Sequence, residues 1–214
     1  MWFYLPTEHQ LTIIRSVDMS EEAVKARAQA LPDDLKNSLA LDDEADGEGQ
    51  EESVYDVLGK WIDDAAKEKG DINKVPDVEI YLKAKELGIE SKHRTPAVLA
   101  QTIFTTGIVK EIVPRASMLK KLITSEKHEK AFLGGLERFV GNDHPELVSQ
   151  ISSILLQIYE NDLVSEETLK AWGAKASKKY VDLATSRKVR KSAEKFIEWL
   201  DQAESDEESE EESD

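Results

Sequence analysis

The 214-residue sequence has no cysteine, which excludes a disulfide framework, a thiolate zinc site and a cysteine nucleophile. It also lacks any run of about 18 apolar residues, so we expect no transmembrane helix. The first 15 residues are partly apolar, but Pro6 and Glu8 interrupt them and no basic segment precedes them, unlike a signal peptide. These absences fit a reducing compartment, and we expect a cytoplasmic protein.

Metal-binding patterns are scarce. The four histidines lie far apart, and none pairs with another at His-x-x-x-His spacing: His9, His93, His128 and His144. Histidines distributed in this way are typical of surface or capping groups. We therefore expect no metal site and no cofactor.

Catalytic patterns are equally weak. Ser-x-x-Lys occurs at Ser117–Lys120 and at Ser192–Lys195, but neither has the partner motifs of an enzyme that uses it. Gly134 and Gly135 fall inside a helical pattern and follow no strand, so they indicate a close contact between helices, not a phosphate loop. We predict that the chain is not an enzyme.

The net charge of −16 is unevenly distributed. Residues 1–56 carry 14 acidic and 4 basic residues, residues 201–214 carry 9 acidic residues and no base, and residues 57–200 have a net charge of +3. A nearly neutral globule between two acidic arms makes nucleic acid an unlikely main ligand and favours basic partners.

Composition also divides the chain into four segments. We expect a leader at residues 1–16, either foreign to the protein or a divergent disordered end. An acidic linker with a short helix follows at 17–52, because low hydrophobicity and unopposed charge predict disorder. A helical domain occupies 53–203, and a disordered acidic tail occupies 204–214.

From Ser53 onward, apolar residues recur at three- and four-residue spacing almost without a break, which predicts amphipathic helices. Ser53, Ser125 and Ser165 are suited to cap helices, and Gly70 to end one. We expect helices at about 53–69, 77–87, 95–106, 125–140, from 142–145 onward, after 165 and at 186–203, with one or two more between 108 and 123. This pattern predicts an all-α domain, built as a stack of helix pairs or as an irregular bundle.

Two segments place tryptophan beside clustered carboxylates: residues 158–172, ending in Trp172, and residues 196–212, which include Trp199. Carboxylates attract ammonium groups, and an aromatic face contacts both the charge and the aliphatic stem of lysine. Such segments suit lysine-rich ligands. Tyr159, Phe196 and Leu200 lie on apolar stripes and are expected in the core, whereas either tryptophan fits the core or a contact surface.

These segments resemble the two acidic-aromatic boxes of the carboxy-terminal two-tryptophan domain of translation initiation regulators. The stretches 134–139, 172–181 and 196–200, followed by an acidic tail, are most similar to the eukaryotic translation initiation factor 5 branch of that family, and residues 20–28 resemble its linker. The resemblance covers roughly 17–212. It implies a HEAT-like stack of antiparallel helix pairs and an adaptor role in translation initiation.

The partners that the resemblance implies are lysine boxes in the beta subunit of initiation factor 2, the amino-terminal part of subunit c of initiation factor 3, and initiation factor 1. By the motif match, the first box contributes Glu166, Glu167 and Trp172. The second box and the acidic tail contribute the remaining partner-binding residues: Glu198, Trp199, Asp201, Glu204, Asp206, Glu207, Glu208, Glu210, Glu211 and Glu212.

Two departures from the family pattern limit this inference. The family's GTPase-activating arginine lies in an amino-terminal domain with a zinc ribbon, which this cysteine-free sequence lacks, so we expect no GTPase activation. A tryptophan of the family linker is replaced by Arg15-Ser16, which leaves inhibition of GDP release open. Two alternatives also remain: a nucleotide-exchange domain of the factor 2B epsilon type, and a basic-protein chaperone with an acidic tail.

Two further sites are hypotheses. A second, basic face for acidic partners would be formed by Arg187, Lys188, Arg190 and Lys191, although a solvated helix flank is the favoured interpretation of these residues. Ser205 and Ser209 are each followed by three acidic residues, which suits phosphorylation by an acidophilic kinase such as casein kinase 2.

Overall fold

The computed structural model describes the backbone of residues 53–211 and the side chains of residues 53–202. This part of the chain contains no strand, which confirms the all-α prediction. The expected leader and linker, residues 1–52, lie outside it. The α-helices are α3 (Val54–Lys69), α4 (Asp77–Glu86), α5 (Arg94–Thr102), α6 (Ile108–Leu122), α7 (Glu126–Arg138), α8 (Ile151–Glu160), α9 (Glu166–Ala174) and α10 (Leu183–Glu211). The shorter elements are the 3-10 helices η3 (Ile72–Lys74) and η5 (Pro145–Gln150) and the π-helical turn η4 (Phe139–Asp143).

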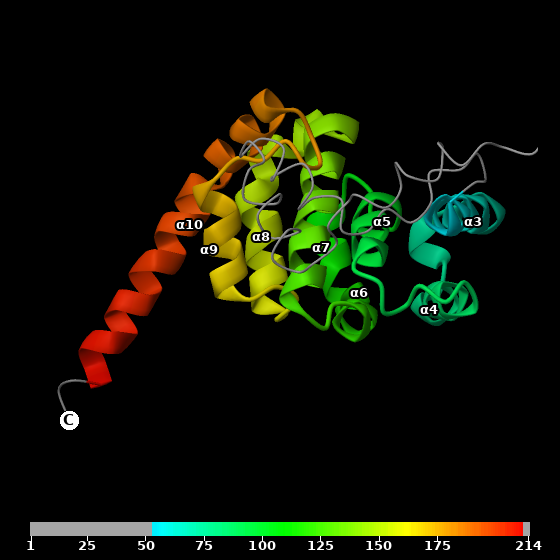
Figure 1. Ribbon diagram of the computed structural model, residues 1–214, viewed down its shortest axis with the longest axis horizontal. Coiled ribbons are helices and arrows are strands. Elements are labelled where there is room, and N and C mark those ends of the chain that lie inside the picture. Colours follow the sequence, from blue (N-terminus) through cyan, green and yellow to red (C-terminus); the bar gives the residue numbers. More distant parts are fainter. Residues whose placement is uncertain (1–52, 212–214) are drawn as a thin grey trace, which may run out of the picture. The chain divides into compact units, whose positions relative to one another are not determined.

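The helices form two layers (Figure 1). In one layer α3 contacts α5, α5 contacts α7 and α7 contacts α9. In the other, α4 contacts α6, α6 contacts α8 and α8 contacts α10. Helices that alternate between two layers along the chain are typical of antiparallel pairs stacked as in HEAT repeats. The alternative of an irregular bundle is therefore excluded for residues 53–211.

Most helix boundaries follow the capping residues. The hydroxyls of Ser53, Ser125 and Ser165 accept hydrogen bonds from backbone amides in the first turns of α3, α7 and α9. Gly70 ends α3 with φ of 78°, a left-handed conformation that costs glycine little. Each cap satisfies backbone groups that the helix itself leaves unpaired, so the prediction of these boundaries is confirmed.

Residues 108–123, for which one or two helices were expected, form the single helix α6 with Pro114 inside it. Proline in a helix interior costs about 3 kcal/mol or more, because it removes one backbone hydrogen bond and crowds the preceding turn. Ile112 and Ala116, on either side of the proline, are both buried. Their packing holds the helix together through Pro114.

The expected long helix from residues 142–145 is wrong in its first half. The π-helical turn η4 closes where the His144 amide donates to the Phe139 carbonyl, and the His144 ring packs 4.6 Å from the Phe139 ring. Pro145 has no amide proton to continue the pattern, and η5 follows it. Regular α-helix begins only at Ile151.

The expected end of the last helix, near Ala203, is also too early. The backbone of α10 stays helical to Glu211, so residues 204–211 of the expected acidic tail belong to this helix. The packed first part of α10 provides the nucleus, and adding residues to an existing helix needs no new nucleation. Alanine and glutamate are also good helix formers.

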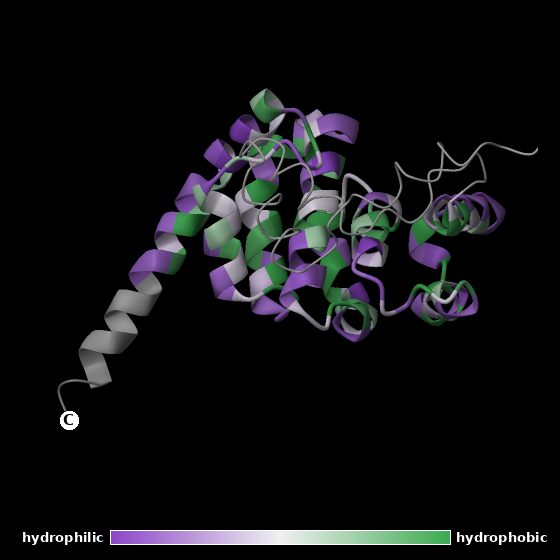
Figure 2. Cartoon of the chain, in the orientation of Figure 1, coloured by the Kyte–Doolittle hydropathy of each residue, from purple (hydrophilic) through white to green (hydrophobic). Residues whose placement is uncertain are grey.

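Hydrophobic residues gather where the helices meet, and hydrophilic residues line their outer faces (Figure 2). The core includes Phe132, Phe139 and Ile112, all 2 % exposed or less. A Cβ atom on Gly135 would overlap the Ala97 carbonyl oxygen, so α5 and α7 approach backbone to backbone. This confirms the close helix contact expected of Gly134-Gly135. No described helix is long and apolar enough to span a membrane.

Candidate functional site

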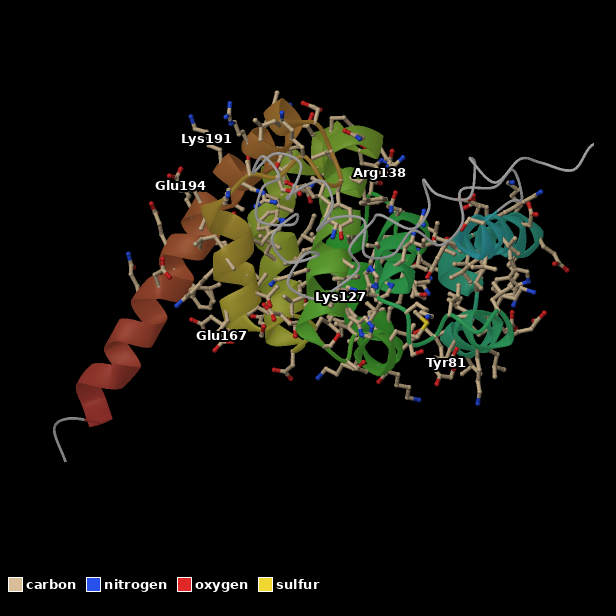
Figure 3. All side chains as sticks on the ribbon, in the orientation of Figure 1. Tyr81, Lys127, Arg138, Glu167, Lys191 and Glu194 are labelled. Carbon is tan, nitrogen blue, oxygen red and sulfur yellow. The ribbon has the colours of Figure 1, made fainter. Side chains whose placement is uncertain are left out.

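The two acidic-aromatic segments lie on helices that contact each other. The first segment runs from the end of α8 through α9, and the second lies in α10, which packs against both α8 and α9 (Figure 1). The Ser165 cap places Glu166 and Glu167 in the first turn of α9, where the helix dipole favours negative charge. Glu167 is exposed, and Figure 3 labels it on the outer side of α9 in this view.

Trp199 is the exposed tryptophan of the site. It is 46 % exposed, although it lies one residue before the fully buried Leu200. The Tyr159 ring meets the indole edge to face, with centroids 5.9 Å apart and an interplanar angle of 85°. The centroid of the Phe196 ring lies 5.9 Å from that of the Trp199 indole. Packing against two rings holds the indole in place while leaving part of it open to a ligand.

Carboxylates from both segments converge through Lys170. Its ammonium lies 2.7 Å from Glu166 Oε1 and 3.3 Å from Asp201 Oδ1, so it joins α9 to α10. The Tyr159 hydroxyl donates to the other oxygen of Glu166 at 3.4 Å. Glu198, next to Trp199 in the sequence, is also exposed. The structure therefore brings Glu166, Asp201 and the surroundings of Trp199 together, as the boxes predicted.

Trp172 does not belong to an exposed surface, and its assignment as a partner-binding residue is corrected. The side chain is 8 % exposed. The Arg190 guanidinium stacks over its ring, 4.8 Å from the centroid. The same guanidinium donates to the Trp172 carbonyl. Trp172 packs beneath Arg190 of α10 and exposes little of its ring.

Arg190 likewise does not belong to a free basic face. It forms a two-pronged contact with Glu137, through Nε to Oε1 at 3.0 Å and Nη2 to Oε2 at 3.2 Å. Glu137 is 1 % exposed and also accepts from the Ser186 hydroxyl at 2.7 Å. A buried carboxylate needs such partners because burial removes its hydration. Of the four predicted residues, Arg187, Lys188 and Lys191 are exposed.

The segment between α9 and α10 closes over α7. The Arg190 guanidinium donates to the Lys175 carbonyl, and the Ser177 amide donates to the Ser186 hydroxyl at 3.0 Å. A Cβ atom on Gly134 would overlap the Tyr180 ring, so only glycine accommodates this side chain. Burial, and then the Glu137 charge, raise the Tyr180 pKa above its ordinary value. Ser177 and Tyr180, which lie in the 172–181 stretch of the family resemblance, therefore pack against the fold.

Asp182 caps the start of α10, which begins three residues earlier than expected. Its carboxylate accepts from the Ala184 and Thr185 amides at 2.9 and 3.0 Å and from the Thr185 hydroxyl. These hydrogen bonds, first those from Thr185, hold the Asp182 pKa below its ordinary value. The spacing of Asp182 before Thr185 is a capping signal that the sequence contained.

Several predicted residues lie beyond the described side chains. Glu204, Ser205, Asp206, Glu207, Glu208, Ser209, Glu210 and Glu211 lie in the last turns of α10, and Glu212 follows it. Within residues 53–202, no three histidine or acidic side chains come together as a metal site would require. Sequence reasoning missed Lys170, although Glu166 and Lys170 stand four residues apart, a spacing that favours an ion pair in a helix.

Comparison with known proteins shows which family the chain resembles. The W2 family (eIF4-gamma/eIF5/eIF2-epsilon) matches residues 128–210. "Probable eukaryotic translation initiation factor 5" from Schizosaccharomyces pombe is 45 % identical over 189 residues, covering 88 % of this chain and 46 % of that protein. Eukaryotic translation initiation factor 5 from Saccharomyces cerevisiae is 40 % identical over 195 residues, covering 91 % of this chain and 44 % of that protein. The chain thus spans about half the length of these relatives.

A solved structure agrees with the sequence comparison. The carboxy-terminal domain of translation initiation factor 5 at low pH is 45 % identical, with a TM-score of 0.70, and the match covers 78 % of this chain and 100 % of that one. Identity at this level over a whole domain establishes more than a shared fold. The chain belongs to the eukaryotic translation initiation factor 5 family, and it corresponds to the carboxy-terminal W2 domain of these proteins.

Proposed function

We propose that this chain is a non-catalytic adaptor in translation initiation, and that the surface around Trp199 binds lysine-rich segments of other initiation factors. In this role it helps to assemble the preinitiation complex in the cytoplasm. The observation that carries the proposal is the exposed indole of Trp199, which is supported by the Tyr159 and Phe196 rings. Tyr159 also contacts Glu166 of α9, and the exposed Glu198 precedes Trp199 on α10.

Lys170 illustrates the kind of group that this surface takes. Its ammonium already bridges two carboxylates, and its side chain is 22 % exposed. A lysine of a partner would meet the same chemistry at the exposed Glu198, with the indole beside it for a cation–π contact and for the aliphatic stem. Each exposed ion pair is worth about 0–1 kcal/mol, so useful affinity needs several lysines.

The sequence adds attraction at longer range. The 9 acidic residues of positions 201–214 have no base among them, and massed charge of one sign accelerates the approach of an oppositely charged partner. Membership of the factor 5 family makes other initiation factors the class of partner. The family resemblance names the beta subunit of initiation factor 2, subunit c of initiation factor 3 and initiation factor 1 as the proteins to test.

The decisive experiment measures the affinity of a lysine-box peptide for the wild-type chain and for Trp199→Ala by fluorescence anisotropy. We expect the variant to bind roughly two- to thirtyfold more weakly, because a cation–π contact is worth about 0.5–2 kcal/mol. Leu82→Ala is the matched control, since Leu82 is also a large exposed side chain, at 55 %, but lies on α4. Equal affinity of wild type and Trp199→Ala would refute the proposed site.

Two other functions give different results. The description of the W2 family also names eIF2-epsilon. A nucleotide-exchange domain of that type would accelerate GDP release from initiation factor 2, whereas we expect this chain not to accelerate it. A basic-protein chaperone would bind through tail charge alone. It would therefore lose affinity when the tail acids are replaced by alanine but would be indifferent to Trp199→Ala.

A further inference from the structure

A groove of about 660 Å³ runs between α9 and α10. Its apolar floor is formed by two small residues of α9, Gly173 and Ala174, and by Ile197 of α10. A Cβ atom on Gly173 would lie 2.7 Å from Ile197 Cγ1, so a larger residue there would fill the floor. A volume of this size accommodates side chains of a bound segment.

The α10 rim of this groove changes sign along its length. Arg187 and Lys191 line its first part, and Glu194, Glu198 and Asp201 line its second. Arg190 lies between them but is neutralised by the buried Glu137. Figure 3 shows Lys191 and Glu194 on the same side of α10, one turn apart.

Four of these rim charges are available to a ligand. Arg187, Lys191, Glu194 and Glu198 are exposed, and none of them forms an ion pair with another side chain in the described range 53–202. Besides Arg190, Asp201 also has a partner there, Lys170. With a rise of 1.5 Å per residue, the eleven steps from Arg187 to Glu198 span about 16 Å, or three helical turns.

We propose that this groove binds an amphipathic helical segment of another protein that carries acidic residues toward its amino-terminal end, lysines toward its carboxy-terminal end and one apolar face. The acids lie over Arg187 and Lys191, the lysines over Glu194 and Glu198, and the apolar face packs on Gly173, Ala174 and Ile197. The inference deepens the proposed function and rests on it for the lysine-binding end.

The order of charges along the bound segment also stabilises the segment as a helix. Acids near the amino terminus and lysines near the carboxy terminus both interact favourably with the helix dipole. The segment therefore lies parallel to α10, with its amino terminus at the Arg187 end. A segment of lysines throughout would place like charges against Arg187 and Lys191, an arrangement that selects against it.

The test uses the full 214-residue chain and two synthetic peptides of identical composition and net charge. One places its acids before its lysines along one side of an apolar face, and the other mixes the same acids and lysines around the same apolar positions. Circular dichroism first shows that the two peptides have equal helicity in the free state. Anisotropy titrations then measure the ratio of their affinities, which we expect to favour the ordered peptide roughly tenfold, as several matched rim charges would.

The decisive variant reverses the basic end of the groove, Arg187→Glu with Lys191→Glu. We expect the preference for the ordered peptide to fall to about onefold, because the whole rim is then acidic. The matched control is Lys188→Glu with Lys195→Glu. These two exposed residues of the same helix do not line the groove, and the change in net charge is the same. The control should keep the tenfold preference.

Each result decides the matter. The inference is overturned by any of three results for the preference for the ordered peptide. The wild type shows no such preference, the Arg187→Glu with Lys191→Glu variant keeps it, or the control variant loses it equally. An all-lysine peptide tested on Trp199→Ala in the same assay examines the proposed function separately. If that peptide depends on Trp199 while the ordered peptide shows no preference, lysine binding stands and the two-signed groove does not.

Discussion

Trp172 and Trp199 have the same side chain and opposite surroundings. Trp172 is 8 % exposed beneath the Arg190 guanidinium, and Trp199 is 46 % exposed beside Tyr159 and Phe196. The difference arises because Arg190 is drawn inward by the buried carboxylate of Glu137, a residue on α7. At the residue scale, the exposure of each indole therefore depends on whether a neighbouring charge covers its face, and of these two tryptophans only Trp199 is exposed.

Lys170 competes with any lysine that a partner brings. Replacing it with glutamine removes the ammonium that bridges Glu166 and Asp201. Because partly exposed ion pairs contribute about 0–1 kcal/mol, we expect Lys170→Gln to bind a lysine-box peptide roughly two- to fivefold more tightly. Lys188→Gln removes the same charge elsewhere on the surface. An increase no larger than that of Lys188→Gln would show that only net charge matters.

Asp182 gives a prediction about pH. Hydrogen bonds from Thr185 and Ala184 hold its folded-state pKa below the ordinary value of 3.8. A group with a lowered pKa stabilises the fold above its unfolded pKa, and this stability is lost as the pH falls through the folded pKa. We therefore expect Asp182→Asn, which keeps a capping side chain, to lose less melting temperature than wild type between about pH 6 and pH 3. Equal losses would contradict this assignment.

At the scale of the elements, glycine determines how closely neighbouring segments approach. Gly135 lets α7 touch the backbone of α5, Gly134 receives Tyr180, and Gly173 lets Ile197 approach α9. Each contact joins segments that are distant in the sequence. The α9–α10 arrangement that carries the candidate surface thus depends on positions where no side chain is present.

Gly135→Ala tests the contact between α5 and α7. The added Cβ would overlap the backbone of Ala97, which cannot move as a flexible side chain would. Overpacking of this kind costs about 1–3 kcal/mol, so we expect a lower free energy of unfolding in urea denaturation. Gly59→Ala on α3 is the control. Its nearest neighbour would lie 3.7 Å away, and alanine should stabilise that helix by up to about 1 kcal/mol. Equal effects of the two substitutions would argue against the close contact.

At the scale of the whole molecule, most of the net negative charge lies outside the segment that forms the helical core. Residues 57–200 have a net charge of +3, whereas residues 201–214 carry 9 acids without a base. The helices supply a rigid surface, and the carboxy-terminal acids add attraction at a distance. Such attraction acts through solvent and is screened by salt.

Binding of a lysine-box peptide should therefore weaken strongly between about 0.1 and 0.5 M salt, as the screening length falls well below 10 Å. Replacing Glu207, Glu208, Glu210, Glu211 and Glu212 with alanine should lower affinity and flatten this dependence while leaving the melting temperature unchanged. Titrations at several salt concentrations measure both effects. A salt dependence that is equally steep without these acids would assign the attraction to the helical surface alone.

The sequence determined the helices, most of their ends and the segments that would carry the site. Serine caps, Gly70 and the three- and four-residue apolar spacing are local signals, which can be recognised in the sequence without knowledge of the fold. The same reasoning failed for the length of α10, for residues 139–150 and for Trp172. These depend on nucleation by a packed neighbour, on the His144–Phe139 contact and on a charge from another helix.

What the amino-acid order decided by itself was therefore the α-helical class, the acidic-aromatic segments and the division of charge. The tertiary structure alone decided that Trp199 is open and Trp172 closed, that Arg190 is neutralised by Glu137, and that cations and anions share one groove. The physical reason is that burial and ion pairing depend on atoms brought together from α7, α9 and α10, and spacing along one chain does not specify which residues of distant helices will meet.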